Sequence, residues 1–170
     1  GMNTNETVII DSKLQVNSII RTPSPNVNTA FIEGKTYLLS IGKTLPNDEK
    51  LGYLFQVNAG GKLAKLVDGL KRPVDMQVAD FNGDGTMDYL LCEYGYQAGQ
   101  LVWVDGKSKE RHLLKSQPGA RNVIINDLSK DGKPDIIVLM AEAKEGVSLF
   151  INKGTGLFVE KPLLQFESVW

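Results

Sequence analysis

The chain has 170 residues, of which 42% are apolar and 23% charged, and this content suits one hydrophobic core better than two. Nineteen basic residues stand against twenty acidic ones, so the formal net charge is −1 and a strongly basic surface for nucleic acid or anionic membranes is excluded. The longest apolar run, residues 136–141, is far shorter than the roughly 18 residues of a membrane-spanning helix. We therefore expect one domain over residues 2–170 that binds no nucleic acid and does not insert into a membrane.

The chain opens with a half-unit at residues 6–22. Its last apolar pair is Ile19-Ile20, and the pair Leu66-Val67 follows 47 residues later. A third pair, Leu113-Leu114, follows after another 47 residues, so the spacing indicates a repeated structural unit. We interpret residues 6–22 as the tail of an earlier unit.

Three full units follow the half-unit, at about residues 27–68, 73–116 and 120–168. The second and third units share acidic residues and glycines as well as apolar residues. Asp80, Asp84, Gly85 and Asp88 meet Asp127, Asp131, Gly132 and Asp135 at the 47-residue offset. The match therefore extends to side chains that carry chemistry.

The first unit lacks the acidic part of the repeat. In its place the sequence runs Glu33-Gly34-Lys35-Thr36, which we align as five residues shorter than the other units. An insertion around residues 45–50 restores the 47-residue phase. We therefore expect this unit to have the same fold without the loop.

Within each unit, short apolar segments rich in Val, Ile, Leu, Tyr and Phe are separated by Gly, Asn, Asp or Pro, a pattern typical of β-strands. Val74, Met76 and Val78 alternate with small or polar residues, whereas residues 136–140 are continuously apolar, as expected for a strand covered on both faces. Four such strands in 47 residues match the size of a propeller blade. The predicted fold class is all-β, a β-propeller fragment of about three and a half four-stranded blades.

The loop of the second unit carries oxygen-bearing groups at alternating positions. They are the side chains of Asp80, Asn82, Asp84 and Asp88 and the backbone carbonyl of Thr86. Gly85 supplies the positive φ that the sharp turn needs. Carboxylates tolerate such crowding around a cation, and Ca²⁺ accepts about six to eight oxygen ligands in flexible geometry, whereas softer metals prefer His or Cys. The sequence therefore predicts a calcium site in this loop.

The loop of the third unit repeats the pattern with weaker chemistry. Its candidate ligands are Asp127, Ser129, Asp131, the backbone carbonyl of Lys133, and Asp135. Ser129 is a poorer oxygen ligand than an amide, and the charges of Lys130 and Lys133 oppose a cation, so we expect this loop to bind calcium more weakly. In both loops we expect the ion to be structural, because an ion that binds only the folded chain stabilises it.

The run from Asp80 to Leu91 resembles the D-x-[DN]-x-D-G-x-x-D strand–loop–strand signature of FG-GAP/VCBS repeats, the blades of integrin-α-like propellers, and residues 127–138 repeat it. Residues 152–158 are similar to the asparagine-glycine-phenylalanine stretch that ends such blades. The resemblance implies calcium in these loops on one rim and partner binding by loops on the opposite rim. It also implies an extracellular, cell-surface or periplasmic protein, whose export signal we expect upstream of this segment.

On the opposite rim the resemblance implies a set of candidate partner-binding residues. They are Lys71, Arg72, Tyr94, Tyr96, Gln97 and Arg121. The two tyrosines and Gln97 belong to the connection between the second and third strands of the unit. A plain surface loop is the alternative interpretation, and the sequence does not distinguish a protein ligand from a carbohydrate ligand.

The sequence indicates a binding and scaffolding module and no enzyme. His112 is the single histidine and Cys92 the single cysteine, so a multi-histidine metal centre is excluded, and nothing resembles a nucleophile elbow. We expect His112 in an outer strand and Cys92 buried as a small apolar side chain. The alternative is an accessory or catalytic part of a carbohydrate-active enzyme such as a polysaccharide lyase, since propellers with similar loops occur in that class.

The expected number of blades has a consequence for assembly. Three and a half blades do not close a ring, so the end sheets would expose apolar faces and unpaired edges. We expect a second copy of the chain, or further blades of a longer protein, to cover them. Inside the stack we expect Trp103, and Phe150 at the matching position of the third unit, to pack between blades.

Overall fold

A computed structural model describes residues 5–142 and 144–166. Fourteen β-strands and one short 3₁₀ turn, η1 (Ala59–Gly61), make up its regular structure. The strands are, in chain order, β1 (Glu6–Ile10), β2 (Val16–Arg21), β3 (Asn26–Ile32), β4 (Lys35–Ser40), β5 (Gly52–Val57), β6 (Leu63–Leu70), β7 (Pro73–Ala79), β8 (Asp88–Glu93), β9 (Gln100–Val104), β10 (Arg111–Lys115), β11 (Ala120–Asn126), β12 (Asp135–Met140), β13 (Gly146–Asn152) and β14 (Phe158–Gln165).

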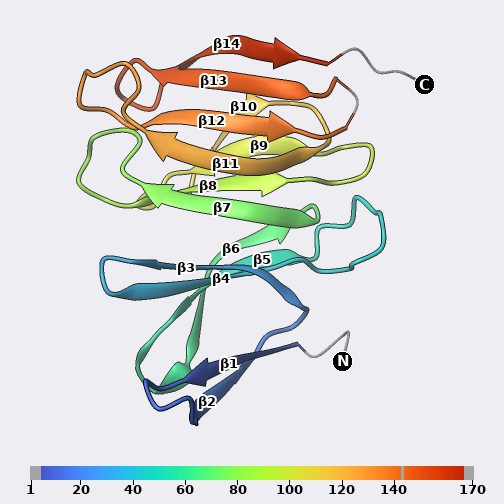
Figure 1. The fold of residues 1–170 in the computed structure, drawn as a ribbon, viewed down its shortest axis with the longest axis vertical. Coiled ribbons are helices and arrows are strands. Elements are labelled where there is room, and N and C mark those ends of the chain that lie inside the picture. Colours follow the sequence, from blue (N-terminus) through green and yellow to red (C-terminus); the bar gives the residue numbers. More distant parts are fainter. Residues whose placement is uncertain (1–4, 143, 167–170) are drawn as a thin grey trace.

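The strands form three four-stranded antiparallel sheets, β3–β6, β7–β10 and β11–β14, and a two-stranded sheet, β1–β2. Figure 1 shows these sheets stacked in chain order along the long axis of the molecule. Each large sheet is one repeat unit, so the prediction of an all-β propeller fragment with three and a half blades is confirmed, and the stack is not closed into a ring. The part of the chain that the structure describes contains no helix long and apolar enough to cross a membrane.

The sheets are held together by apolar side chains on both of their faces. Tyr37 and Leu54 of the first blade pack with Leu91 of the second in one buried cluster. Trp103 of the second blade packs with Val138 of the third in another. A smaller cluster joins Ile20 of the β1–β2 hairpin to the first blade. Strand β8 therefore lies buried between two neighbouring sheets, whereas β12, predicted to be covered on both faces, leaves Leu139 39% exposed on its outer face because it belongs to the last blade of the stack.

The first unit has a shorter turn than the sequence alignment predicts. Asn28 pairs with Leu39 in the β3–β4 ladder, and Asp75, which lies 47 residues after Asn28, pairs with Cys92. Because Cys92 lies 53 residues after Leu39, the turn is six residues shorter than the acidic loop, and the predicted five is wrong. A one-residue change of register moves every side chain of a strand to the other face. The number of residues in the turn therefore follows from the strand pairing.

A one-residue difference in register shows that the predicted match between Trp103 and Phe150 is wrong. Trp103 pairs with Leu90 in the second blade, whereas Phe150 pairs with Ile136, the residue 47 positions after Tyr89. The structural counterpart of Phe150 is therefore Val104, and Phe150 faces back toward the second blade. Both aromatic residues still pack between blades as expected, because they meet in the same cluster.

The first strands of the three blades are joined by a buried carboxylate, Asp75, which is 5% exposed. The side-chain amide of Asn28 donates to its Oδ1, and that of Asn122 donates to its Oδ2 at 2.8 Å. The backbone N–H of Val123 donates to Oδ2 at 2.9 Å. Asn28, Asp75 and Asn122 are spaced 47 residues apart, so one position of the repeat connects all three full blades.

Replacing Asp75 should weaken the stack. Asp75→Ala removes the acceptor of three donors in a buried place, so we expect the free energy of unfolding to fall by about 2–4 kcal/mol. Asp75→Asn keeps one carbonyl oxygen and should cost less. Urea unfolding of the two variants measures the difference. If Asp75→Ala lowers the free energy of unfolding no more than replacement of an exposed aspartate does, Asp75 does not connect the blades.

Candidate calcium loops and the opposite rim

The loop between β7 and β8 is closed by its own side chains. Asp80 Oδ1 accepts the N–H of Gly83 at 2.7 Å, and Asp80 Oδ2 accepts the N–H of Gly85 at 2.8 Å. Asn82 Oδ1 accepts the N–H of Asp84 at 2.9 Å, and Asp84 Oδ1 accepts that of Thr86 at 2.7 Å. Gly85 has φ +81°, the conformation expected for it. The loop thus brings Asp80, Asn82 and Asp84 together in one tight turn.

Asp88 has a different place from the other candidate ligands. It is fully buried at the start of β8, where its Oδ2 accepts the N–H of Phe81 at 2.9 Å and its Oδ1 accepts the N–H of Gly106 at 2.8 Å. A Cβ on Gly106 would lie 1.9 Å from the carbonyl oxygen of Met87, so only glycine allows this approach. Burial raises the pKa of the Asp88 carboxyl, although both backbone hydrogen bonds lower it. Asp88 therefore ties the loop to the end of β9.

The loop between β11 and β12 repeats this arrangement. Asp127 accepts the N–H groups of Asp131 and Gly132 at 3.0 and 2.9 Å. The buried Asp135 accepts the N–H of Ser129 at 2.7 Å and that of Asn152 at 2.9 Å. Gly132 has the expected positive φ, +82°. The two acidic loops therefore share one architecture.

The donor set of both loops fits calcium chemically. A carboxylate oxygen that accepts one N–H keeps a lone pair for a cation, and the loops offer oxygen ligands without His or Cys. Their side chains lie around backbone N–H groups, and no cluster of three or more His, Cys, Asp or Glu with metal-site geometry occurs in residues 5–142 and 144–166. Calcium binding would therefore require the carboxylates of the β7–β8 loop to turn their free lone pairs toward one point.

A lysine stands beside each loop. Lys133 Nζ donates to Asp131 Oδ2 at 2.8 Å, while Lys107 Nζ lies 3.9 Å from Asp84 Oδ2. This ion pair, with the backbone N–H of Lys133, lowers the pKa of the Asp131 carboxyl. A cation entering the second loop would have to displace a closer ammonium group than one entering the first.

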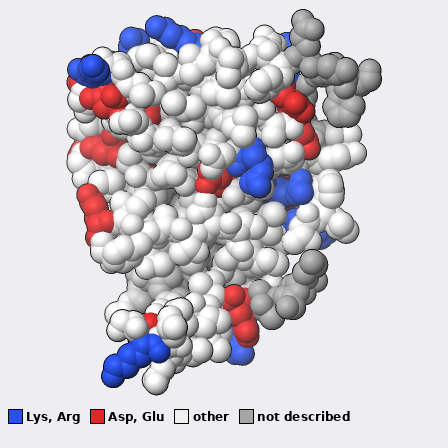
Figure 2. Space-filling view, in the orientation of Figure 1, with Lys and Arg blue, Asp and Glu red and all other residues white. Residues whose placement is uncertain are grey.

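The opposite end of the blades carries the β8–β9 connection. Figures 1 and 2 show acidic side chains, with some basic ones above them, at the end where β7 and β11 turn back, and basic and acidic side chains together toward the other end. Asp48 of the β4–β5 loop accepts the N–H groups of Tyr96, Gln97 and Ala98, with distances of 2.8 to 3.1 Å. These bonds, that of Ala98 above all, lower the pKa of the Asp48 carboxyl. One carboxylate therefore fixes this rim loop from the neighbouring blade.

Three of the six predicted rim residues line one cavity of about 490 Å³. Arg72 lies over the ring of Tyr94, with the guanidinium carbon 5.3 Å from the ring centroid, and Arg121 at the start of β11 lines the same hollow. Glu142 completes the lining and lies close to Tyr94. Burial, followed by the nearby Glu142 carboxyl, raises the pKa of Tyr94.

The other three predicted rim residues do not line the cavity. Lys71 donates from its backbone N–H to the buried Glu93 and from Nζ to the carbonyl of Ala98. Tyr96 and Gln97 are exposed and contribute their backbone to the Asp48 contact. Sequence reasoning missed Asp48 and Glu142, because both come from connections outside the 47-residue match of the acidic loops.

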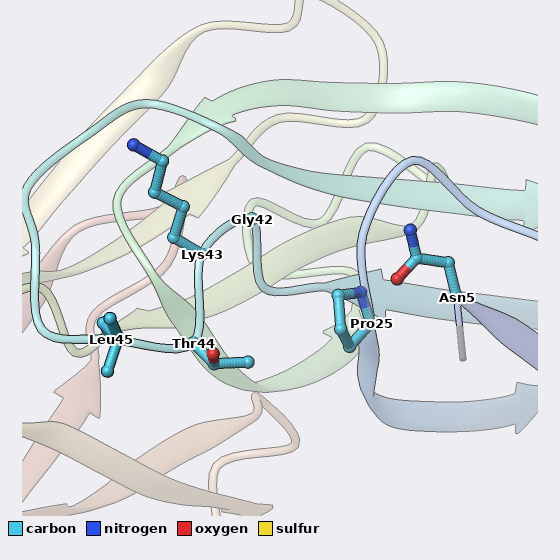
Figure 3. Close-up of a pocket in the computed structure, with 6 residues that line it drawn as sticks. All are labelled: Asn5, Pro25, Gly42, Lys43, Thr44 and Leu45. Carbon is cyan, nitrogen blue, oxygen red and sulfur yellow. The ribbon is translucent and has the colours of Figure 1, made fainter. Parts of the chain in front are cut away.

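A second hollow, of about 260 Å³, lies between the β2–β3 connection and the β4–β5 loop. Figure 3 shows it lined by Asn5, Pro25 and the segment Gly42–Leu45, with the ammonium group of Lys43 pointing away from Pro25 and Asn5. Lys43 pairs instead with Glu49. The hollow therefore lacks converging polar groups.

His112 and Cys92 lie where the sequence predicts. His112 is in the outer strand β10 and stacks on Trp103, with ring centroids 4.0 Å apart. Cys92 is fully buried, and burial raises the pKa of its thiol well above the usual value. A thiol in this state is a poor nucleophile.

The stacked four-stranded blades and their acidic strand–loop–strand turns define a repeat protein of the β-propeller type. Residues 80–138 match the family model described as FG-GAP-like repeat, so this part of the chain is similar to a family of non-catalytic repeat modules. A search of curated proteins found no match.

The contact made by Asp48 should be visible in the pH dependence of stability. Because its pKa is lowered in the folded chain, its contribution is complete above about pH 5, where the unfolded carboxyl is also ionised, and is lost as the pH falls through the folded pKa. Asp48→Asn should therefore lower Tm at neutral pH, and the difference from the unmodified chain should shrink in acid.

Thermal melts across this pH range measure the effect, and Glu49→Gln in the same loop is the matched control. A Tm difference for Asp48→Asn that is the same at pH 3 as at pH 7 would show that the carboxylate charge has no part in fixing the loop.

Proposed function

We propose that this chain is a calcium-binding β-propeller repeat module that serves recognition or scaffolding in a larger exported protein and has no catalytic role of its own. The observation that carries the proposal is the pair of acidic loops with one architecture, in a region matching FG-GAP-like repeats. The ligands proposed for the first ion are Asp80, Asn82, Asp84, the Thr86 carbonyl and Asp88. Those for the second are Asp127, Ser129, Asp131, the Lys133 carbonyl and Asp135.

The position of the loops supports a structural role for the ion. Each loop joins the first two strands of a blade, and its buried Asp88 or Asp135 also accepts the N–H of a residue at or just beyond the end of the third strand, Gly106 or Asn152. An ion shared by the exposed and buried carboxylates would link three strands. Because Asp88 sits in a place where burial disfavours its charge, a nearby cation would offset that cost.

The exposure of the loops supports an exported location. Asp84 and Asp131 are exposed, and each faces a lysine, so we expect weak sites of the kind found in extracellular modules, with Kd of about 10⁻⁴–10⁻³ M. Such sites fill where calcium is millimolar, outside the cytosol.

Calcium should raise the melting temperature of the metal-stripped chain. At millimolar Ca²⁺ we expect Tm to rise by about 3–10 °C, since binding to the folded state alone adds a few kcal/mol at most. The double variant Asp84→Ala, Asp131→Ala should lose this rise.

Asp11→Ala is the matched control, because Asp11 also accepts backbone N–H groups in a tight turn, at 2.8 and 3.0 Å, but outside the acidic loops. It should keep the full response, and Mg²⁺ at equal concentration should give a smaller one. A wild-type chain whose Tm does not change with calcium would reduce the loops to ordinary turns.

We also propose that the open face of the third blade binds a further blade, from a second copy or from the parent protein. Leu90, Cys92 and Trp103 of the second blade are at most 2% exposed beneath the third blade. Their counterparts in the strand pairing are Ile137, Leu139 and Leu149. Leu139 is 39% exposed, so the face that is covered in one blade is open in the next.

This face should drive self-association of the isolated chain. We expect sedimentation equilibrium at micromolar concentrations to show dimers or larger species, and Leu139→Asp to shift them toward monomer. Leu45→Asp, which changes an exposed leucine on the β4–β5 loop, should leave the distribution unchanged. A strictly monomeric wild-type chain would contradict the proposal.

A further inference from the structure

The rim cavity lined by Arg72, Tyr94, Arg121 and Glu142 has the character of a built site. Its walls come from different blades and are held by backbone hydrogen bonds. The N–H of Gly119 donates to the carbonyl of Tyr94 at 3.0 Å, and the N–H of Ala141 donates to that of Gly119 at 2.8 Å. The cavity is therefore shaped before any ligand enters.

Two positive charges meet one negative charge in this cavity. Arg72 donates from a terminal nitrogen to the carbonyl of Gly95 at 3.2 Å, yet its Nε is buried and has no hydrogen-bond partner among the described residues. A buried guanidinium donor without an acceptor is costly, and a ligand oxygen that the Arg72 side chain turns to meet would remove that cost. With Glu142 ionised, the lining carries a net charge of about +1, which suits a ligand with a single negative charge.

The same lining contains an acceptor. Glu142 lines the cavity together with the two arginines, and a carboxylate oxygen can accept hydrogen bonds from more than one donor. A bare carboxylate would be repelled by Glu142, whereas a ligand with hydroxyl groups beside its carboxylate could donate to it. Val27 and Val74 supply apolar wall for a carbon skeleton.

We infer that this cavity binds a hydroxylated carboxylate, of which a uronic acid is the sugar example. The guanidinium groups of Arg72 and Arg121 hold the carboxylate, and Glu142 accepts from a ligand hydroxyl. The inference rests on the recognition role proposed above and names its ligand class, but it does not depend on calcium in the acidic loops. An acidic peptide fits less well, because its side chain offers no hydroxyl to Glu142.

Calorimetric titration of the chain with galacturonate and glucuronate, against galactose, glucose and acetate, tests the inference. We expect the two uronates to bind at least about tenfold more tightly than the neutral sugars, since the charged hydrogen bonds are missing in the latter. Arg121→Gln should weaken uronate binding about tenfold or more. Arg21→Gln, the same change on the exposed strand β2, should leave it unaltered.

Glu142→Gln separates a hydroxy acid site from a plain anion site. It should strengthen acetate binding and reduce the preference for uronate over acetate. Equal binding of galactose and galacturonate, tighter binding of an aspartate-rich peptide than of either uronate, or unchanged uronate affinity in Arg121→Gln would each overturn the inference.

The titrations are run on calcium-loaded and metal-stripped samples whose Tm is also measured. Uronate binding without a calcium-dependent Tm contradicts only the calcium proposal. A calcium-dependent Tm without uronate binding contradicts only this inference.

Discussion

Each four-stranded sheet of this protein is apolar on both faces, and the structure depends on covering those faces with neighbouring sheets. The clusters around Leu91 and Val138 show the result, because each of these second-strand residues is buried at the contact between its own blade and the preceding one. A sheet with two apolar faces is unstable alone, so the blades stabilise one another in sequence order. The carboxylate of Asp75 adds a polar joint near the first strands, and its three hydrogen bonds define how the blades align.

The stacking also separates two kinds of surface. Antiparallel strands send every first-to-second turn to one end and every second-to-third connection to the other. The acidic loops therefore gather on one rim, where Asp88 and Asp135 anchor them to third strands. The arginines and Tyr94 gather on the opposite rim, which Asp48 stiffens from the preceding blade. Stability and recognition can thus depend on different ends of the same blades.

Much of this architecture could be predicted from the sequence, because a 47-residue repeat of apolar segments indicates stacked blades directly. The register of the strands could not be predicted. One residue fewer in the turn at Glu33, or before Phe150, hardly changes the sequence pattern but moves side chains to the other face of the sheet. The acidic loops were evident from their spacing. The roles of Asp48 and Glu142 were not, because these residues act across blades and have no counterpart at the repeat distance. The contact of Asp75 with Asn28 and Asn122 could have been found from the sequence, because the three residues are spaced 47 positions apart.

We propose above that the two acidic loops are calcium sites of unequal affinity. Isothermal titration of the metal-stripped chain with CaCl₂ measures both affinities, with Asp84→Ala and Asp131→Ala as single variants. We expect two ions per chain, with the tighter site lost in Asp84→Ala and the weaker one lost in Asp131→Ala. Absence of calcium binding in the unmodified chain, or binding that both variants retain in full, would contradict it.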